Sequence, residues 1–194
     1  MQTKKNEELE KILVKINQIL EPAEKSQFKT VESTTNIPTI LQIGSSRTGS
    51  TLFTQYLAAT GQFSYPTNFL SRFYAAPYIG ALIYEMTTNP IYNFRDEFID
   101  IKDKGQFVSE FGKTKGFKSL HEFMYFWRHN FDIKEIPTDL DTFNKSANFD
   151  NFNKEIRLLQ NLWGKPLLLK AHIVNMYLPS LSKNLDNPLF IHIY

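Results

Sequence analysis

A short apolar run that ends in a glycine-rich turn constrains the fold of this chain more than any other stretch. Residues 39–43 read Thr-Ile-Leu-Gln-Ile, Gly44 follows them, and Gly49 comes five residues later. An apolar pattern with helical spacing begins at about residue 50. This order predicts a buried strand, a tight loop and a helix whose first N–H groups and dipole favour an anion. The stretch therefore predicts an α/β domain with a phosphate cradle.

The charged residue of this loop bears on which anion it suits. The glycine spacing fits the Gly-x-x-x-x-Gly pattern of nucleotide-triphosphatase loops, but Ser50 stands where that pattern needs a lysine. The cation is instead Arg47, whose guanidinium is permanently charged and donates in a fork to oxyanions. Thr48 and Thr51 add hydroxyl donors. We expect residues 47–51 to bind an anion, although such a turn can also be a plain connection.

Two further apolar runs complete the predicted sheet. Residues 167–169 are three leucines, and residues 188–194 read Pro-Leu-Phe-Ile-His-Ile-Tyr. Apolar runs separated by helical patterns are typical of parallel strands buried on both faces. The sequence therefore predicts a doubly wound α/β fold. In it, a parallel sheet carries helices on both faces, as a three-layer sandwich like that of P-loop nucleotide triphosphatases.

The expected helices follow from apolar positions at helical spacing and from capping residues. Ser119 and Glu122 form the Ser-x-x-Glu pattern of a capping box, which predicts a helix from residue 119. The aromatic stripe that follows is expected in the core, where its edge could line an acceptor pocket. The predicted helices cover 6–20, 50–60, part of 70–87, 119–131, 150–163 and 176–184, with an extended segment at 63–66 and loops at 90–118 and 132–149.

Two helices carry apolar stripes that predict which side faces the core. Leu52, Tyr56 and Leu57 are expected on the inward face of the helix after the cradle. The first helix is expected to end before Pro22 and to pack on the core, although a detachable arm is the alternative. Its stripe consists of Leu9, Ile12, Leu13, Ile16 and Ile19.

Composition places the chain among globular proteins. Its 194 residues are 42% hydrophobic and 22% charged, which suits one sizeable core. The net charge of +2 is no footprint for nucleic acid, and the absence of cysteine excludes disulfides and thiolate metal sites. We divide the chain into an N-terminal helix and linker, residues 1–37, and a domain of residues 38–194.

No apolar run approaches the ~18–20 residues that span a bilayer. The charged N-terminus also lacks the apolar stretch of a secretory signal. We therefore expect no integral membrane segment and a cytoplasmic location.

A lysine and a histidine end the second predicted strand, as Lys170-Ala171-His172. Ligands of open α/β sheets bind beyond the carboxyl ends of the strands, so this tripeptide and the cradle are expected at one edge. His172 could act as a general base, and Lys170 could stabilise developing negative charge. Taken without the cradle, the pair is more simply a loop histidine and a lysine that extends to solvent.

Residues 43–52, Ile-Gly-Ser-Ser-Arg-Thr-Gly-Ser-Thr-Leu, resemble the 5′-phosphosulfate loop of the sulfotransferase family. The family pattern is Lys or Arg, one residue, Gly, then two Ser or Thr. In cytosolic members a strand ends in Lys-Thr-His, and a proline follows seven residues after the histidine. Here the Lys-Ala-His of residues 170–172 is followed by Pro179. The resemblance covers about residues 38–194.

The resemblance implies sulfuryl transfer from 3′-phosphoadenosine 5′-phosphosulfate to an acceptor hydroxyl or amine, without a metal ion. The acceptor would be a small molecule, a glycan or a lipid. Arg47 would stabilise the leaving phosphate, Lys170 would help hold the transferring group, and His172 would take the acceptor's proton. The implied donor-binding residues are Arg47, Thr48, Gly49, Ser50 and Thr51.

The family pattern is interrupted at two positions. In the family the next strand leads into an Arg and a Ser that grip the 3′-phosphate of the donor. Here that strand is residues 189–194, and the Arg would fall after Tyr194, so we expect a fold cut short before its C-terminal part. Many Golgi-type and bacterial members carry a Glu soon after the first helix, where this chain has Asn68, an amide that cannot act as a base.

Other functions stay open on the residues alone. One is a truncated, non-catalytic remnant that binds a nucleotide or a partner. Another is a degenerate nucleotide kinase or triphosphatase, although the missing loop lysine and the Lys-x-His tripeptide count against it. His121 and Glu122 begin like a zinc-protease helix, but residue 125 is a tyrosine, so a surface or capping role is expected for them. Oligomeric state has no indication in the sequence.

Overall fold

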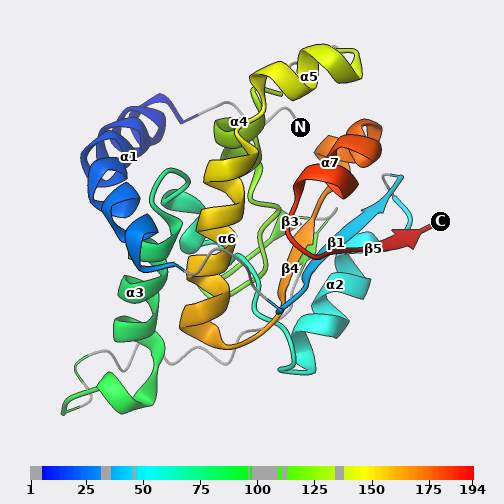
Figure 1. Cartoon of the computed structure of the whole chain (residues 1–194). Coiled ribbons are helices and arrows are strands. Elements are labelled where there is room, and N and C mark those ends of the chain that lie inside the picture. Colours follow the sequence, from blue (N-terminus) through cyan, green and yellow to red (C-terminus); the bar gives the residue numbers. More distant parts are fainter. Residues whose placement is uncertain are drawn as a thin grey trace.

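The three apolar runs of the sequence pair as one parallel sheet in the computed structural model of this chain (Figure 1). The strand order is β4-β1-β5, and Leu41 in the central strand aligns with Leu169 and Phe190. The parallel pairing that the sequence predicts is thus confirmed. The expected burial on both faces is wrong for the third strand, residues 188–193, which lies at an edge of the sheet and is partly exposed. Its strands are β1 (Thr39–Gly44), β4 (Leu167–Lys170) and β5 (Pro188–Ile193). The structure describes residues 6–31, 36–45, 47–95, 97, 109–110, 113–133 and 138–194.

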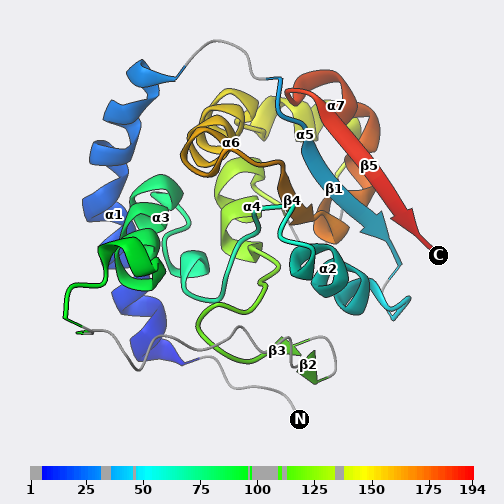
Figure 2. The ribbon, with the colours of Figure 1, turned by 90° about the horizontal axis from the view of Figure 1, so that it is seen from below.

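Different helices cover the two faces of the sheet (Figure 2). On one face, Leu41 and Leu169 pack into a core cluster with side chains of α4 (Met124–Phe131), α6 (Phe149–Trp163) and α7 (Leu178–Asn184). On the other face, the Gln42 amide donates to the Ser50 carbonyl at 3.0 Å, at the start of α2 (Ser50–Ala59). The expectation of a parallel sheet with helices on both faces is met by these contacts.

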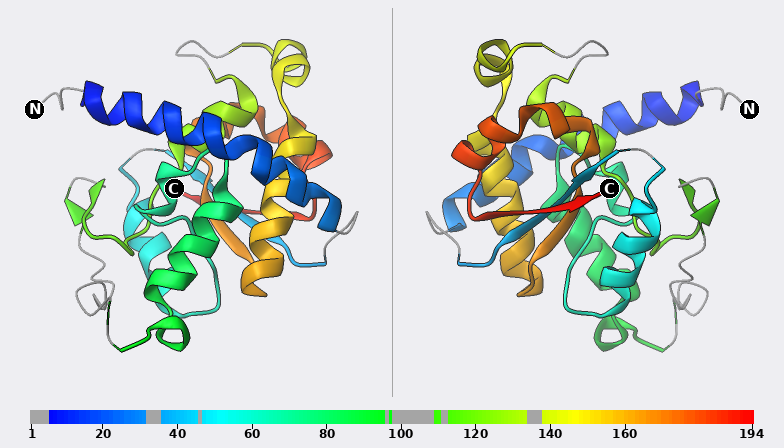
Figure 3. Two further views of the ribbon diagram at one scale, coloured as in Figure 1. Left: turned by 90° about the vertical axis from the view of Figure 1, so that its left-hand side faces the viewer. Right: turned by 90° about the vertical axis from the view of Figure 1, so that its right-hand side faces the viewer.

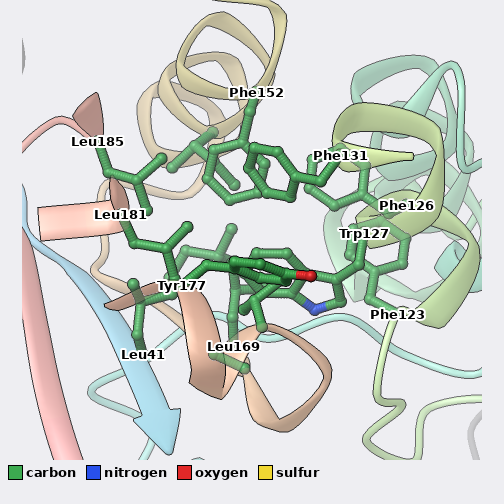
Figure 4. Close-up of a cluster of buried hydrophobic side chains, with 14 of the residues drawn as sticks. Leu41, Phe123, Phe126, Trp127, Phe131, Phe152, Leu169, Tyr177, Leu181 and Leu185 are labelled. Atoms are coloured by element: carbon green, nitrogen blue, oxygen red, sulfur yellow. The ribbon is translucent and has the colours of Figure 1, made fainter. Parts of the chain in front are cut away.

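Aromatic side chains fill the core beside β4 (Figure 4). The Trp127 ring lies 5.2 Å from that of Phe152, and the Phe131 ring lies 5.0 Å from Phe152, measured between centroids. The indole N–H of Trp127 also donates to the carbonyl of Lys170 at 3.1 Å. Such pairs stabilise the fold beyond their burial alone. The aromatic core therefore anchors α4 over the end of β4.

The start of α4 differs from the prediction. The helix begins at Met124 rather than at residue 119, because the Ser119 hydroxyl donates to the Lys115 carbonyl and Leu120 pairs with Thr67 in an antiparallel bridge. Glu122 is therefore no partner in a capping box. The expectation of a helix over 119–123 is wrong, since tertiary pairing outweighs the local capping signal.

The inward face of α2 also differs from the prediction. Leu52 is 72% exposed and Tyr56 is 68% exposed. The buried face instead carries Thr54, whose hydroxyl bonds to the side chain of Gln42 in the neighbouring strand. A polar residue inside the sheet is satisfied in this way, and its partner decides which side of the helix faces inward.

Several smaller elements connect these layers. Residue 64 extends the edge of the sheet, because Ser64 bridges to Leu167 in parallel, which confirms the extended segment at 63–66. α5 is a helix where a loop was expected, and its N-cap is Asp139, whose carboxylate accepts from Thr142. Within the described part of the chain, no helix is both long and apolar enough to cross a bilayer. The remaining elements are α3 (Pro77–Thr88), α5 (Leu140–Ser146), β2 (Ser109–Glu110), β3 (Lys113–Thr114) and the 3-10 turns η1 (Phe28–Thr30), η2 (Leu70–Arg72), η3 (Pro90–Tyr92) and η5 (His172–Tyr177).

The N-terminal helix α1 (Glu7–Gln27) lies along one side of the molecule (Figure 3). It continues through Pro22, so the expected end before that proline is wrong. Its buried residues are Leu13, Asn17 and Glu24, whereas Ile12 and Ile19 of the expected inward stripe are exposed. The helix is therefore oriented by polar contacts that the apolar pattern does not predict.

Asn17 makes one of these polar contacts, at the middle of α1. Its side-chain amide donates to the Arg72 carbonyl at 2.8 Å, and its oxygen accepts from the Ala75 N–H at 2.8 Å. Asn17 thus fixes the backbone on both sides of residue 73, between η2 and α3.

A buried pair of acids holds the C-terminal part of α1. The Glu24 carboxylate accepts from the backbone N–H groups of Tyr78 and Ile79, at 2.6 and 2.9 Å, in the first turn of α3. Its neighbour is the side chain of Glu155 from α6, which is 2% exposed and hydrogen-bonds to Glu24. Burial raises the pKa of Glu155, and the adjacent Glu24 raises it further. Glu155 is therefore the protonated member of the pair at neutral pH.

Candidate functional site

The loop between β1 and α2 has the backbone shape of an anion cradle. Gly44, at the end of β1, has φ 135°, and a Cβ there would lie 2.2 Å from the carbonyl oxygen of Ile193. Gly49 is the N-cap of α2 with φ 77°, and it has no side chain to occupy the first N–H groups of the helix. These groups lack partners within a helix and favour an anion. Ser46 lies outside the described residues.

Arg47 occupies the turn between the two glycines. It has φ 70°, which is uncommon for a residue with a Cβ, and it is exposed on the surface of the loop. The Thr48 hydroxyl donates to the Ser45 carbonyl at 3.0 Å, which closes the turn. Arg47 thus lies beside the start of α2, on the loop where the sequence predicts an anion.

Lys170 lies beside this loop, at the end of the neighbouring strand. Its side chain is buried, and its Nζ donates to the Thr51 hydroxyl at 3.1 Å and to the Glu122 carboxylate at 2.5 Å. β1 and β4 run parallel with Gln42 opposite Lys170, so both strands end at the same edge. The structure therefore brings together the loop and the Lys-Ala-His tripeptide, which are 119 residues apart in the sequence at the Thr51 contact.

His172 follows at the first position of η5. Its ring is half-buried, and within the described part of the chain its Nε2 is buried without a hydrogen-bond partner. Burial lowers the pKa of His172, and the positive charge of Lys170 lowers it further, whereas Glu122 opposes the shift. The imidazole is therefore neutral near pH 7, as a general base must be before it accepts a proton.

Glu122 is a site residue that the sequence analysis interpreted as a helix cap. Its side chain is 48% exposed, and its carboxylate faces the buried ammonium of Lys170. Phe123 next to it has φ 56°, a strained value for an aromatic residue, because the chain turns sharply before α4. The sequence offered one signal for this role, a Glu placed just before a helix of buried aromatic residues. Its partner Lys170 lies 48 residues away, so the pairing could not be predicted.

Asn175 is a second residue that the sequence analysis missed. Its amide donates to the Gly44 carbonyl at 2.6 Å, and its oxygen accepts from the Gly44 N–H at 3.4 Å. One side chain thus holds both backbone groups of the residue where the cradle begins. We therefore assign Asn175 a positioning role for the loop.

A cavity of about 640 Å³ opens beside Glu122. Its walls come from η2 and the residues before it and from the segment that runs from β3 to the start of α4. Asn68, where the family pattern has a glutamate, lies in this wall and donates to the Gly116 carbonyl at 2.8 Å. The described residues that line the cavity are Asn68, Phe69, Ser71, Arg72, Lys113, Thr114, Gly116, Phe117, Leu120, His121, Glu122 and Met124.

Comparison with known proteins adds no relative to this picture. No protein-family model matches the chain, and no curated protein or solved structure matches it. Among the described residues, no group of three histidine or acidic side chains is arranged to hold a metal ion. A functional assignment for this chain consequently depends on the geometry of its own residues.

Proposed function

We propose that this chain is a sulfotransferase domain that moves a sulfuryl group from 3′-phosphoadenosine 5′-phosphosulfate to an acceptor. The observation that carries the proposal is the 3.1 Å contact between Lys170 Nζ and the Thr51 hydroxyl. A glycine-rich anion loop with a displaced arginine and a Lys-x-His strand end are each weak signals alone. Their contact at one sheet edge supports reading them as one site, at the place where open α/β sheets bind ligands.

The proposed donor site uses the loop and the two cations beside it. The N–H groups at the start of α2 and the hydroxyl of Thr51 would bind the 5′-phosphosulfate. Arg47 would stabilise the charge that develops on the leaving phosphate, and Lys170 would hold the transferring group. Thr48 and Ser50 would add donors, and Gly49 lets the backbone approach the ligand closely. His172 is the base that the family resemblance suggests.

The residue at the end of β4 weighs against a nucleotide triphosphatase. Such enzymes hold Mg²⁺ with an aspartate near the loop and contact the phosphates with a loop lysine. Here the neighbouring strand ends in Lys170, and Ser50 occupies the loop-lysine position. Sulfuryl transfer needs no bridging metal, since positioning and electrostatic stabilisation supply the catalysis.

Calorimetric titration with adenosine 3′,5′-bisphosphate, the product of the donor, tests this proposal. We expect the wild-type chain to bind it and Arg47→Ala to bind it about tenfold to a hundredfold more weakly, because a charge-assisted contact to phosphate is lost. Arg128→Ala is the matched control, since Arg128 is an exposed arginine on α4 whose charge acts on Tyr125, the partner of Glu10 in α1. Its affinity should equal that of the wild type.

Two outcomes would overturn the assignment. One is the absence of binding at millimolar ligand by a chain whose circular dichroism shows it to be folded. The other is tighter binding of Mg²⁺-ATP than of the bisphosphate, which would favour the nucleotide kinase or triphosphatase alternative. Binding of the bisphosphate without transfer of labelled sulfate to any acceptor would instead favour a non-catalytic nucleotide-binding domain.

A further inference from the structure

The cavity beside Glu122 has the size and the walls of a small-molecule site. Its volume of about 640 Å³ lies within the range of ligand pockets. On one side the rings of Phe69 and Phe117 stack with centroids 4.4 Å apart, and on another side Arg72 supplies a guanidinium. The cavity therefore offers an apolar surface and a cationic group to the same ligand.

Glu122 is the wall residue that links this cavity to the loop between β1 and α2. Its Oε1 lies 2.5 Å from Lys170 Nζ, and that nitrogen lies 3.1 Å from the Thr51 hydroxyl. Because the carboxylate is 48% exposed, it keeps contact with the cavity while it pairs with the buried ammonium. A catalytic side chain at this position can contact an acceptor in the cavity while it lies close to a donor bound at the loop.

His121 lines the same cavity, but its hydrogen bonding suits a donor rather than a base. Its Nδ1 accepts from the Phe123 N–H at 2.9 Å, which leaves the proton of the neutral ring on Nε2. Burial lowers the pKa of His121, so the ring is neutral at pH 7. Among the described residues of the cavity wall, Glu122 is consequently the side chain able to take a proton.

We propose that this cavity receives the acceptor, a hydroxyl compound that carries an anionic group, and that Glu122, in place of His172, is the catalytic base; this rests on the proposed sulfuryl transfer. His172 is not among the described residues that line the cavity, and its Nε2 is buried. The acceptor oxygen bonds to the donor's sulfur while the bond from sulfur to the bridging phosphate oxygen breaks. That oxygen keeps the electron pair and leaves as adenosine 3′,5′-bisphosphate. The hydroxyl proton passes to the Glu122 carboxylate.

Lys170 couples the two halves of this step. While Glu122 is ionised, it holds the Lys170 ammonium by an ion pair. When Glu122 takes the proton its negative charge is lost, and the ammonium then acts fully on the loop beside Thr51, where negative charge develops. Deprotonation of the acceptor thus strengthens the stabilisation of the leaving group.

The anionic group of the acceptor follows from the charges on the wall. Arg72 is cationic, and Glu122, the one carboxylate among the described wall residues, is paired with Lys170. The α1 residue Asn17 holds the Arg72 carbonyl at 2.8 Å, so the guanidinium extends from a fixed backbone. An acceptor with a carboxylate, sulfate or phosphate complements this wall.

Glu122→Gln tests the catalytic role, because the amide oxygen still accepts from Lys170 but cannot take a proton. We expect adenosine 3′,5′-bisphosphate to bind as in the wild type and kcat to fall about a hundredfold. Glu8→Gln is the matched control, since Glu8 also pairs with a lysine, Lys11, but on the exposed side of α1. An unchanged kcat in Glu122→Gln, with bisphosphate bound normally, would overturn the role of Glu122 and leave the proposed function standing.

The acceptor class is tested with 4-hydroxyphenylacetate and its uncharged methyl ester, which share one phenol. Calorimetry without the donor should show tighter binding of the carboxylate, and Arg72→Gln should remove that preference. The readout is independent of turnover, so it stays informative if donor binding, and with it the proposed function, fails. No binding of 4-hydroxyphenylacetate at millimolar concentration, or equal binding of acid and ester, would overturn the acceptor class.

Discussion

The buried acid pair between α1 and α6 predicts an unusual dependence of stability on pH. Burial and the neighbouring Glu24 raise the pKa of Glu155 above its ordinary value of 4.5, so the folded chain keeps a proton there that the unfolded chain releases. For a group whose pKa is raised on folding, stability is highest below the unfolded pKa and falls as the pH rises toward the folded pKa. The loss is about 1.4 kcal/mol for each pH unit.

Glu155→Gln should remove this loss. The amide has the shape of the protonated acid, donates to Glu24 in its place and carries no titrating proton. Because the folded wild type keeps this proton, its free energy of unfolding falls by about 3 kcal/mol between pH 4.5 and pH 7. No discount for solvent screening is needed, because the Glu155 side chain is 2% exposed. The variant should therefore be more stable than the wild type at pH 7 by up to that amount and nearly equal to it at pH 4.5.

Urea unfolding followed by circular dichroism, at intervals from pH 4.5 to pH 8, measures this difference. The difference between the two proteins isolates the Glu24–Glu155 pair, since His121, His129 and His172, whose pKa values are lowered, titrate in both. Glu8→Gln, at an exposed acid, controls for the loss of one carboxylate. A difference in the free energy of unfolding that stays constant across the pH range would refute the claim that Glu155 is protonated in the folded chain.

Two further substitutions test how the loop and α1 are held. Gly44→Ala should lower stability by about 3 kcal/mol, because its Cβ would lie 2.2 Å from the Ile193 carbonyl oxygen. An unchanged melting temperature would contradict that close approach. Asn17→Ala should cost about 2 kcal/mol, since the Ala75 N–H and the Arg72 carbonyl lose their partner. Urea unfolding measures the cost, and a loss below experimental error would mean that Asn17 does not dock α1.

The strands could be predicted because their signal is local. Three continuous apolar runs each predict a strand buried on both faces, and all three form the sheet. Burial on both faces holds for β1 and β4 but not for β5, where Leu189 is 51% exposed. The order of the strands in the sheet, with β1 between β4 and β5, could not be predicted, because it depends on how the connecting segments pack. The strand, glycine-rich turn and helix at residues 39–59 were likewise predictable, since the apolar run, the glycines and the start of the helix are close together in the sequence.

The wrong predictions share a physical cause, because in each a tertiary partner outweighed a local preference. Pro22 does not end α1, since Glu24 beyond it binds the first turn of α3. Leu52 is exposed because Thr54 bonds to the strand residue Gln42 and turns the other side of α2 inward.

By itself, the sequence determined the α/β class, the three strands and the glycine-rich turn between the first strand and its helix. Each of these rests on neighbours in the chain. Anion binding at residues 47–51 and the chemistry proposed for the end of β4 stay predictions. Tertiary structure decided that Lys170 contacts Thr51, that Glu122 faces Lys170 and that Asn175 clamps Gly44. These contacts join residues 48 to 131 positions apart. Single polar pairs of this kind depend on how the layers pack, and that packing has no periodic trace in the sequence.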